Sequence, residues 1–425
     1  MSSTAESPQP LKIVIVGAGL VGLAAAVALR REGHHVEIYE SSTFKTELGA
    51  GLAIPSNTLR SLIELGCIVT NLNPVENLCF TSMAHDGSEA GLKSDHTDYE
   101  ARYGTPWVMA HRVDIHAELL RMVTTSDIPG PAATLHLGQR VLACNVSNCS
   151  IALATGETIS ADLVVGADGI RSTIRAAVLG EDVHIPASGT AGFRWLVDSA
   201  ALDPYPELDW IVKARPLGAR VISAPMGLGL ADHRTIVIYA CRGGDLINVL
   251  AVHEDKRDQG AVPWNVPTTR DALLDFFSDY HPRFRRLFEL APVDGIHVWQ
   301  MRVVPPLANW IRDRVCILGD AAHASLPTMG QGFGQGLEDA VALATLLPLG
   351  TRRTDIPARL VAYEGMRKPR TEWIARESYE QQAVAEKRGI YLRSIEMRDA
   401  VMGYNVREEV KRVLSELTEL TKSDC

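Results

Sequence analysis

The sequence predicts an α/β protein with an inserted mixed β-sheet and a helical C-terminus. Residues 11–40 read as strand, glycine turn, helix and second strand, an alternation typical of a parallel sheet. Residues 183–300 hold a block of short strand-like runs, which indicates a second sheet inserted into the first unit. Residues 358–377 and 395–420 carry apolar side chains at helical spacing.

Composition restricts the class of protein. The 425 residues are enough for two joined domains, and 46% hydrophobic and 22% charged residues are ordinary for a globular protein. A net charge of -9 without a long Lys/Arg run argues against nucleic-acid binding, so a small-molecule substrate is expected. The apolar run 11–29 contains patterned glycines and ends in charged residues, which argues against a transmembrane segment.

The seven cysteines are scattered, odd in number and without CxxC spacing. This pattern favours neither a disulfide framework nor a zinc site. The histidines add no pair that would lie on one helix face. We therefore expect a reducing, cytoplasmic location and no bound metal.

The first glycine turn is GAGLVG, from Gly17 to Gly22, between a predicted strand and a predicted helix. Gly17 permits the tight turn, Gly19 lets a pyrophosphate approach the backbone, and Gly22 lets helix and strand pack closely. The second strand ends at Glu40, whose carboxylate can accept two hydrogen bonds from ribose hydroxyls. These features favour FAD or NAD over a nucleotide with a 2′-phosphate. The alternative is that Glu40 is only a solvated strand end.

A second glycine turn lies in residues 47–57 and includes Gly51. Another turn so soon after the first unit suggests further backbone wrapped around the same cofactor. A helical pattern follows and stops at Gly66, and residues 78–92 predict a β-hairpin. An amphipathic helix then opens at Arg112, where the local pattern fits a plain surface charge equally well.

The next stretch contains a second motif. Residues 134–165 predict a β-meander that leads into GADGIRS, a buried-type strand that enters a helix through Asp168. Asp168 is either part of a ligand site or only a helix N-cap. Within residues 183–300 we expect strands at 190–197, 208–213, 220–224, 235–240 and 295–304, and helices at 270–280 and 282–290.

The third motif, GDAAHASLPTMGQGFGQGLEDA at 319–340, needs a ligand to explain it. A strand at 314–318 runs into Gly-Asp, and a turn rich in proline and glycine leads to a helix. Such glycines let backbone approach a ligand and leave amide donors free at a helix N-terminus. Without a ligand, ordering so much glycine would cost conformational entropy. The alternative is a glycine-rich turn that binds nothing.

Three motifs in this order resemble the single-component FAD-dependent aromatic hydroxylases. This family includes para-hydroxybenzoate and salicylate hydroxylases and fungal flavin monooxygenases of phenolic natural products. The resemblance covers nearly the whole chain to about residue 375, with local stretches similar to the salicylate hydroxylase branch. It implies a Rossmann-like FAD-binding domain of the para-hydroxybenzoate hydroxylase type at 11–182 and 301–365, a substrate domain at 183–300, and C-terminal helices at 366–425. The polar residues 1–10, which contain proline and serine, are expected to be a mobile tail.

The resemblance also implies roles for single residues. At the adenosine end of FAD, it implies a contact of Glu40 with the ribose and contacts with the pyrophosphate by Gly17, Gly19, Leu20 and Gly22. Asp320 would contact the ribityl chain, and the isoalloxazine would lie beside Gly330, Gln331, Gly332 and Phe333. Gly51 and Arg112 are implied as further FAD contacts, and Asp168 belongs to a motif shared with the nicotinamide nucleotide. Pro327 would border the face where oxygen reacts. Phe333 and Ala324 depart from the family pattern, so the resemblance does not fix the shape of the pocket.

The reaction that the resemblance implies is hydroxylation of a phenolic or other electron-rich aromatic substrate. NADPH or NADH would reduce FAD, O2 would add at the flavin C4a carbon, and the hydroperoxide would pass one oxygen to the ring. Arg194 and Tyr239 on the inserted sheet are expected to contact the substrate, because a cation or donor favours the reactive phenolate. The alternatives are a surface ion pair for Arg194 and a core position for Tyr239.

Other outcomes stay open. The same oxygenation could dearomatise a phenol or epoxidise an indole or alkene, because only the shape of the pocket decides. In a different class, the chain would bind FAD without oxygenase turnover. His323 is expected to be part of the loop rather than a base, and the chain to be a monomer or a homodimer.

Overall fold

The computed structural model describes residues 8–44, 49–213, 215–223, 234–257, 263–294, 296–383 and 394–423. Most of the tail predicted at 1–10 lies outside these ranges. So do part of the glycine turn at 47–57 and the ends of two predicted strands, Ala224 and Gly295.

A six-stranded sheet carries the three sequence motifs. Its order is β19-β20-β12-β1-β2-β8, and neighbours are parallel except at the edge pair β19 and β20. The strands are β1 (Lys12–Val16), β2 (His35–Glu40), β8 (Thr134–Leu137), β12 (Leu163–Gly166), β19 (Ile311–Arg312) and β20 (Val315–Ile317). Because β1, β12 and β20 are neighbours that run in the same direction, the motifs that follow them meet at one edge of the sheet.

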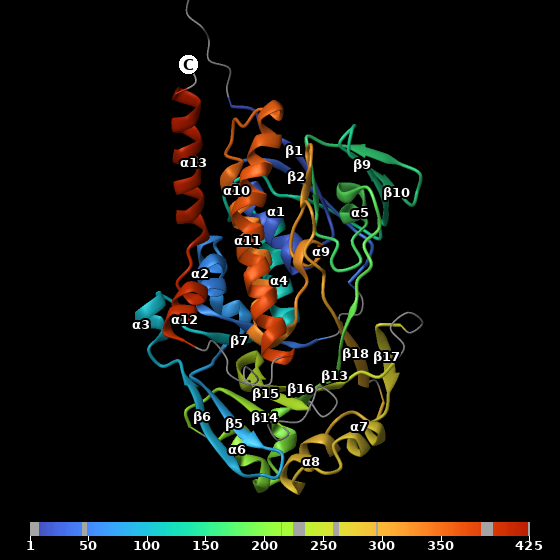
Figure 1. Cartoon of the computed structure of the whole chain (residues 1–425), viewed down its shortest axis with the longest axis vertical. Helices are drawn as coiled ribbons and strands as arrows, with labels where there is room; N and C mark the ends of the chain where they lie inside the picture. Colours follow the sequence, from blue (N-terminus) through green and yellow to red (C-terminus); the bar gives the residue numbers. More distant parts are fainter. Residues whose placement is uncertain are drawn as a thin grey trace, which may run out of the picture.

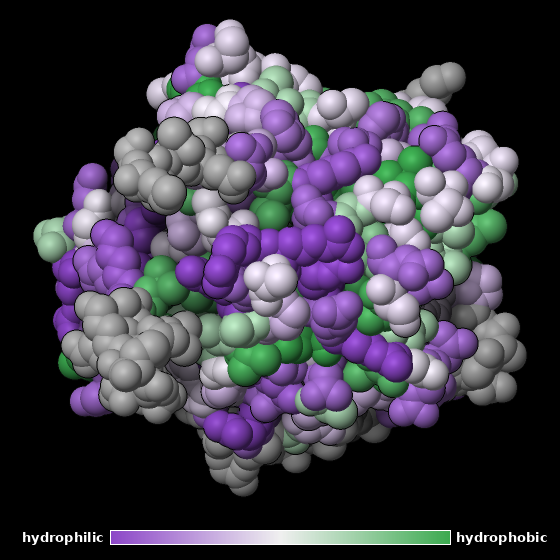
Figure 2. Space-filling view, turned by 90° about the horizontal axis from the view of Figure 1, so that it is seen from above, coloured by the Kyte–Doolittle hydropathy of each residue, from purple (hydrophilic) through white to green (hydrophobic). Residues whose placement is uncertain are grey.

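Helices cover this sheet in two layers (Figure 1). The buried helix α1 (Leu20–Arg31) packs against α10 (Gly332–Leu346), and its run of alanines lets the two backbones approach. The long helix α11 (Ile356–Ala383) and α13 (Val406–Ser423) pack on the outside of α10. Seen from above Figure 1, this end of the molecule mixes hydrophilic and apolar residues (Figure 2).

An eight-stranded sheet forms the lower part of the molecule in Figure 1. Its order is β17-β18-β13-β16-β15-β14-β5-β6, with one parallel pair between β14 and β5. The strands are β5 (Cys79–Ala84), β6 (Glu89–Asp95), β13 (Ala187–Asp198), β14 (Ala219–Ser223), β15 (Thr235–Cys241), β16 (Leu246–Glu254), β17 (Asn265–Thr268) and β18 (Ile296–Arg302). The predicted hairpin, β5 and β6, comes from before residue 183, so this sheet is not confined to residues 183–300.

Two smaller sheets and the remaining helices complete the fold. One sheet, β3 (Gly51–Ile54), β7 (Val108–His111) and β4 (Val75–Glu76), packs against β15 and so joins the two large sheets. The other contains β9 (Val141–Asn145), β10 (Ser150–Leu153) and β11 (Thr158–Ser160). The helices are α2 (Ser56–Glu64), α3 (Tyr99–Tyr103), α4 (Arg112–Thr124), α5 (Thr173–Leu179), α6 (Asp209–Val212), α7 (Arg270–Phe276), α8 (Pro282–Glu289), α9 (Asp320–His323) and α12 (Ile395–Met402). No helix in the described ranges is long and apolar enough to cross a membrane.

The predicted α/β class is confirmed, but the segment 208–213 was wrongly predicted as a strand. Most of it forms helix α6, after a short 3-10 turn that begins at Pro206. Proline fixes a φ that suits the first turn of a helix, and Leu208 and Ile211 are buried at helical spacing. Strand β16 was not predicted at all.

The C-terminal helix predicted at 395–420 is two helices, α12 and α13. Gly403 ends the first. The side chain of Asn405 then accepts hydrogen bonds from the backbone N–H groups of Arg407 and Glu408, which caps the start of the second.

Candidate active site

The three motifs touch one another at the edge of the parallel sheet. Val16, which precedes the first turn, pairs with Gly166, which in turn pairs with Ile317 before the third motif. Gly17 has a φ of 101°, and a Cβ built on it would lie 2.5 Å from the carbonyl oxygen of Ala167. The first two turns therefore pack so closely that only glycine fits between them.

The space in front of Gly19 fits a pyrophosphate. A Cβ built on Gly19 would meet no atom of the described residues within 4 Å, whereas one on Gly22 would lie 2.0 Å from the carbonyl oxygen of Gly17. Gly22 is thus required by helix packing, and Gly19 is not required by any protein neighbour. Leu20 begins α1, so the first N–H groups of this helix are available to an anion.

Glu40 lies beside the same turn at the end of β2. Its carboxylate accepts hydrogen bonds of 2.7 Å from the backbone N–H groups of Ala18 and Ser42. The Nε2 atom of His116 bonds to the carbonyl oxygen of Ala18 at 3.0 Å and so supports the turn from the other side. Glu40 is therefore a fixed, half-buried acceptor rather than a freely solvated strand end.

Asp320 opens α9 and is exposed to solvent. The surrounding protein is nevertheless dense enough for desolvation to raise the pKa of its carboxyl, against the opposing effects of His323 and Arg112. The exposed oxygens of Asp320 are open to a ligand. This environment fits hydroxyl groups of a bound ligand.

The glycine turn before α10 forms an open strip. Pro327 and Gly332 are exposed, while Gln331 and Phe333 are buried. Gly330 has a φ of 60°, a left-handed conformation that favours glycine. The side chain of Phe333 packs in the main core. Any contact that it makes with a cofactor is therefore through its backbone.

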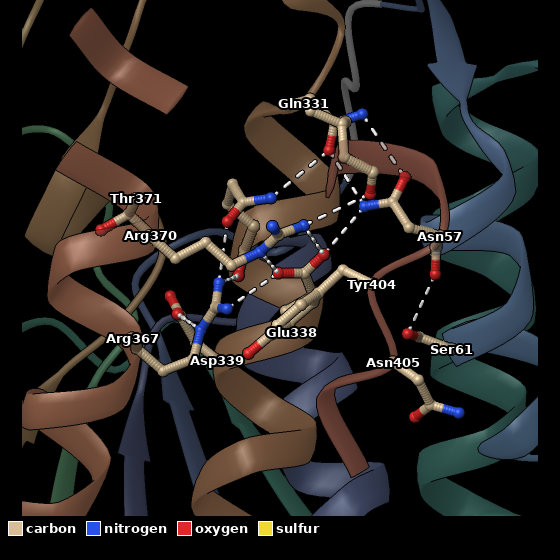
Figure 3. Close-up of polar contacts among 12 residues, drawn as sticks. Asn57, Ser61, Gln331, Glu338, Asp339, Arg367, Arg370, Thr371, Tyr404 and Asn405 are labelled. Atoms are coloured by element: carbon tan, nitrogen blue, oxygen red, sulfur yellow. Dashed lines mark hydrogen bonds and ion pairs between the residues drawn. The ribbon is translucent and has the colours of Figure 1, made fainter. Parts of the chain in front are cut away.

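A buried network of charged groups holds this strip from behind (Figure 3). Glu338 and Asp339 of α10 pair with Arg367 of α11, and all three side chains are almost fully buried. Sequence analysis did not identify Arg367. The available signal was a Glu-Asp pair within an apolar helix, because buried carboxylates need buried cations.

The side chain of Asp168 binds the start of helix α5, whose N-cap residue is Ser172. Its carboxylate accepts hydrogen bonds from the Ser172 hydroxyl and from the backbone N–H groups of Thr173 and Ile174, at the start of α5. Desolvation raises the pKa of this carboxyl. Asp168 is therefore not the N-cap itself, although its carboxylate accepts hydrogen bonds from the first turn of α5, and a cofactor role at this motif stays a prediction.

A hollow of about 380 Å³ opens next to the Asp168 motif. The guanidinium groups of Arg171 and Arg302 lie 4.3 and 4.6 Å from the ring centre of Trp264, and His184 also lines the hollow. The charge of Arg171 contributes to a lowered pKa of Arg302, after desolvation. Two guanidinium groups held beside one hollow favour an anionic ligand.

Residues of the eight-stranded sheet converge on Gly51. The Nη2 atom of Arg194 donates a hydrogen bond of 2.5 Å to the carbonyl oxygen of Gly51, and Oδ1 of Asn248 accepts one of 2.9 Å from its N–H group. A Cβ on Gly51 would lie 2.5 Å from the ring of Tyr239. Sequence analysis did not identify Asn248, which lies on the unpredicted strand β16.

The Arg194 guanidinium still has bonding capacity. Its Nε atom is buried without a hydrogen-bond partner among the described residues. Tyr239 lies beside Arg194, and desolvation raises the pKa of its phenol to about 12 even though Arg194 lowers it. At neutral pH Tyr239 therefore keeps its proton and can donate a hydrogen bond.

The chain is similar to known proteins along most of its length. The profile of a family described as FAD binding domain matches residues 10–378. The chain is 62% identical over 417 residues to hispidin-3-hydroxylase of Neonothopanus nambi, and the match covers 97% of this chain and 98% of that protein. It is 30% identical over 400 residues to a salicylate hydroxylase of Pseudomonas putida, which covers 87% and 86% of the two chains. The crystal structure of CtdE in complex with FAD and a substrate has the same fold, with a TM-score of 0.81 and 19% identity over 97% of this chain and all of that one.

Proposed function

We propose that this chain, which belongs to the FAD binding domain family, hydroxylates hispidin or a closely similar aromatic compound. The chain is an FAD-dependent monooxygenase that uses NAD(P)H and O2 on an aromatic substrate. The observation that carries the choice of substrate is the 62% identity to a hispidin-3-hydroxylase along almost the whole of both chains. Salicylate is the second candidate, supported by a relative at 30% identity.

FAD binding is assigned to the residues around the meeting point of the three motifs. Gly17, Gly19 and the start of α1 would hold the pyrophosphate, and Glu40 the adenosine ribose. Asp320 would hold the ribityl chain. When bound, FAD accepts hydride from NAD(P)H and activates O2 for insertion into the ring. The protein contributes binding, orientation and exclusion of water.

At the substrate end, Arg194 and Tyr239 are proposed to orient the aromatic ring. The positive charge of Arg194 would stabilise the phenolate form of a phenol, in which the ring is more electron-rich. The protonated phenol of Tyr239 would donate a hydrogen bond to a substrate oxygen. Because Arg194 also holds Gly51, the substrate ring and the cofactor loop would be positioned by one side chain.

The nicotinamide nucleotide is assigned to the hollow next to Asp168. Arg171 and Arg302, which Trp264 holds by contact with its ring, would bind its phosphates. The pairing of two cations in a chain of net charge -9 supports this assignment. We also propose that the protein is cytoplasmic and that it is a monomer or a homodimer. Light scattering of the purified protein would test the oligomeric state.

Turnover of defined substrates tests the proposal. The purified protein is reconstituted with FAD and supplied with NADPH or NADH and with hispidin, salicylate or indole. Faster NAD(P)H oxidation with hispidin, and a product that gains one ring oxygen, is the expected result. Turnover of salicylate alone would leave the monooxygenase assignment intact and overturn the substrate. An epoxide or a dearomatised ring would show that the pocket directs the oxygen differently.

A further inference from the structure

Helix α10 carries two acidic residues where its neighbours are apolar. Glu338 is 1% exposed and Asp339 is fully buried, within a helix whose other residues from Phe333 onward belong mainly to the core. Burial of a carboxylate is costly unless it is paired and hydrogen-bonded. The pair therefore needs partners, and the structure supplies them from α11.

Arg367 bridges the two carboxylates. Its Nε atom donates to Oδ1 of Asp339 at 2.9 Å, and its Nη1 atom donates to Oε2 of Glu338 at 2.8 Å. The Nη2 atom donates to the backbone and side-chain oxygens of Gln335. Burial alone would lower the pKa of Arg367, but the two carboxylates raise it, so the guanidinium stays charged.

Each carboxylate also holds one cofactor loop. Oε1 of Glu338 accepts a 2.8 Å hydrogen bond from Nδ2 of Asn57, and the same amide donates at 3.0 Å to Oε1 of Gln331 in the strip before α10. Oδ2 of Asp339 accepts hydrogen bonds from the N–H group of Gly319 at 3.0 Å and from Nε2 of His323 at 2.5 Å. The loop at 319–323 and the strip at 330–332 are thus fixed to one arginine through two acids.

A second arginine connects this network to the C-terminal helices. Arg370 donates to both oxygens of Glu338, at 2.8 and 3.1 Å, and to the carbonyl oxygens of Ala400 and Val401 at the end of α12. Its guanidinium lies 3.6 Å from the ring centre of Tyr404 (Figure 3). The two anions of α10 are thus balanced by two cations of α11, and the carbonyl groups at the end of α12 bind the outer cation, Arg370.

We propose that Arg367 is a positioning residue for bound FAD, which acts through Glu338–Asn57–Gln331 on one loop and through Asp339 on the other. The proposal rests on FAD binding at the meeting point of the three motifs. Arg367 itself does not touch the ligand space, because it is fully buried behind α10. Its role is to hold both loops in one relative position and to balance the charge behind them.

The first test replaces Arg367 by Met, which keeps length but leaves two buried carboxylates with one cation fewer. We expect at least a tenfold rise in the Kd for FAD, measured by flavin fluorescence on apoprotein. We also expect a shift of the midpoint potential of the bound flavin to more negative values, because added negative charge disfavours the anionic reduced form. Arg376→Met is the matched control, since Arg376 is exposed on the same helix; it should change neither quantity.

Two further variants separate positioning from folding. Arg367→Lys keeps the charge and should restore the potential toward that of wild type while FAD affinity recovers only in part. Asn57→Ala leaves all four charges in place but cuts the link to Gln331, so it should weaken FAD binding and change the visible absorption spectrum of the flavin.

Wild-type affinity, potential and spectrum in Asn57→Ala, or in folded Arg367→Met, would overturn the proposal even if thermal stability fell. If Arg367→Met does not fold, Arg367→Lys and Asn57→Ala decide the matter. Failure of the wild-type protein to bind FAD would instead overturn the assignment of the cofactor site.

Discussion

The guanidinium of Arg194 donates a hydrogen bond of 2.5 Å to the carbonyl oxygen of Gly51. The two residues are 143 positions apart and belong to different sheets, β13 and β3. Asn248 holds the N–H group of the same glycine. The backbone of the second glycine turn is therefore held on both sides by the sheet that carries the predicted substrate contacts.

Replacement of Arg194 by Ala should lower the rate of product formation much more than it weakens FAD binding. Loss of a hydrogen bond from a charged donor and loss of the cation near the substrate should lower the rate of product formation by about 100-fold. The FAD Kd should change less than about tenfold, because Gly51 would be one of many proposed contacts. Product analysis and flavin fluorescence measure the two effects. Arg194→Lys, which keeps the charge, should recover part of the rate; full turnover by the Ala variant would rule out the role.

Gly19 and Gly22 offer a matched pair of substitutions. Gly19 has φ and ψ of -67° and 178°, which alanine adopts readily, and its Cβ would meet only a ligand. Gly19→Ala should leave the Tm of the apoprotein unchanged within about 2 °C and raise the FAD Kd at least tenfold. Gly22→Ala should destabilise the fold itself by about 3 kcal/mol through its clash with the Gly17 carbonyl. An equal loss of Tm in both variants would contradict the open space at Gly19.

The sequence was sufficient to predict the motifs and the elements on which they lie. A GxGxxG turn between an apolar strand and a helix is compatible with few local folds, so β1, α1 and the turn at Gly17 lie in the order that the sequence predicts. The parallel sheet followed from the same alternation. What joins the motifs, however, is the order of β20, β12 and β1, and this depends on contacts between segments about 150 residues apart.

Other features could not be predicted, because their partners are far away in the chain. Glu338 and Asp339 indicated a buried cation, but nothing local to Arg367 distinguished it from the other arginines of α11. Asn248 lies on a strand that was not predicted. Segment 208–213 was wrong because a short apolar run fits a strand and a helical turn equally well.

A substitution in the hollow next to the Asp168 motif should weaken binding of the nicotinamide nucleotide alone. Arg171 is exposed and stacks on Trp264, so Arg171→Ala should not affect folding. We expect the KM for NADPH or NADH to rise about fivefold to tenfold, with FAD affinity unchanged. The KM of the wild type should also rise with salt more steeply than that of the variant. Arg285→Ala, at an exposed site on α8, is the control, and an unchanged KM in Arg171→Ala would place the nucleotide elsewhere.

The lowered pKa of Asp339 predicts that the folded protein loses stability in acid. Burial alone would raise the pKa of its carboxyl, but His323 and Arg367 lower it to about 2, below the ordinary value of 3.8. Because the folded-state pKa is the lower one, the unfolded chain binds the proton more tightly than the folded protein does. The contribution of Asp339 to stability is therefore complete above about pH 5 and is lost as the pH falls toward 2. The total is about 2 kcal/mol, of which about half is lost at pH 3.

This prediction can be measured by urea denaturation of wild type and Asp339→Asn apoprotein between pH 6 and pH 3. The variant should be less stable at pH 6, because Asn cannot neutralise Arg367. Its deficit should shrink by about 1 kcal/mol at pH 3, where the carboxyl of the unfolded wild-type chain is mostly protonated while that of the folded chain is still ionised. A deficit that is constant with pH would mean that Asp339 stabilises the fold through its hydrogen bonds alone. The charge balance behind the cofactor loops would then rest on Glu338 and Arg370 instead.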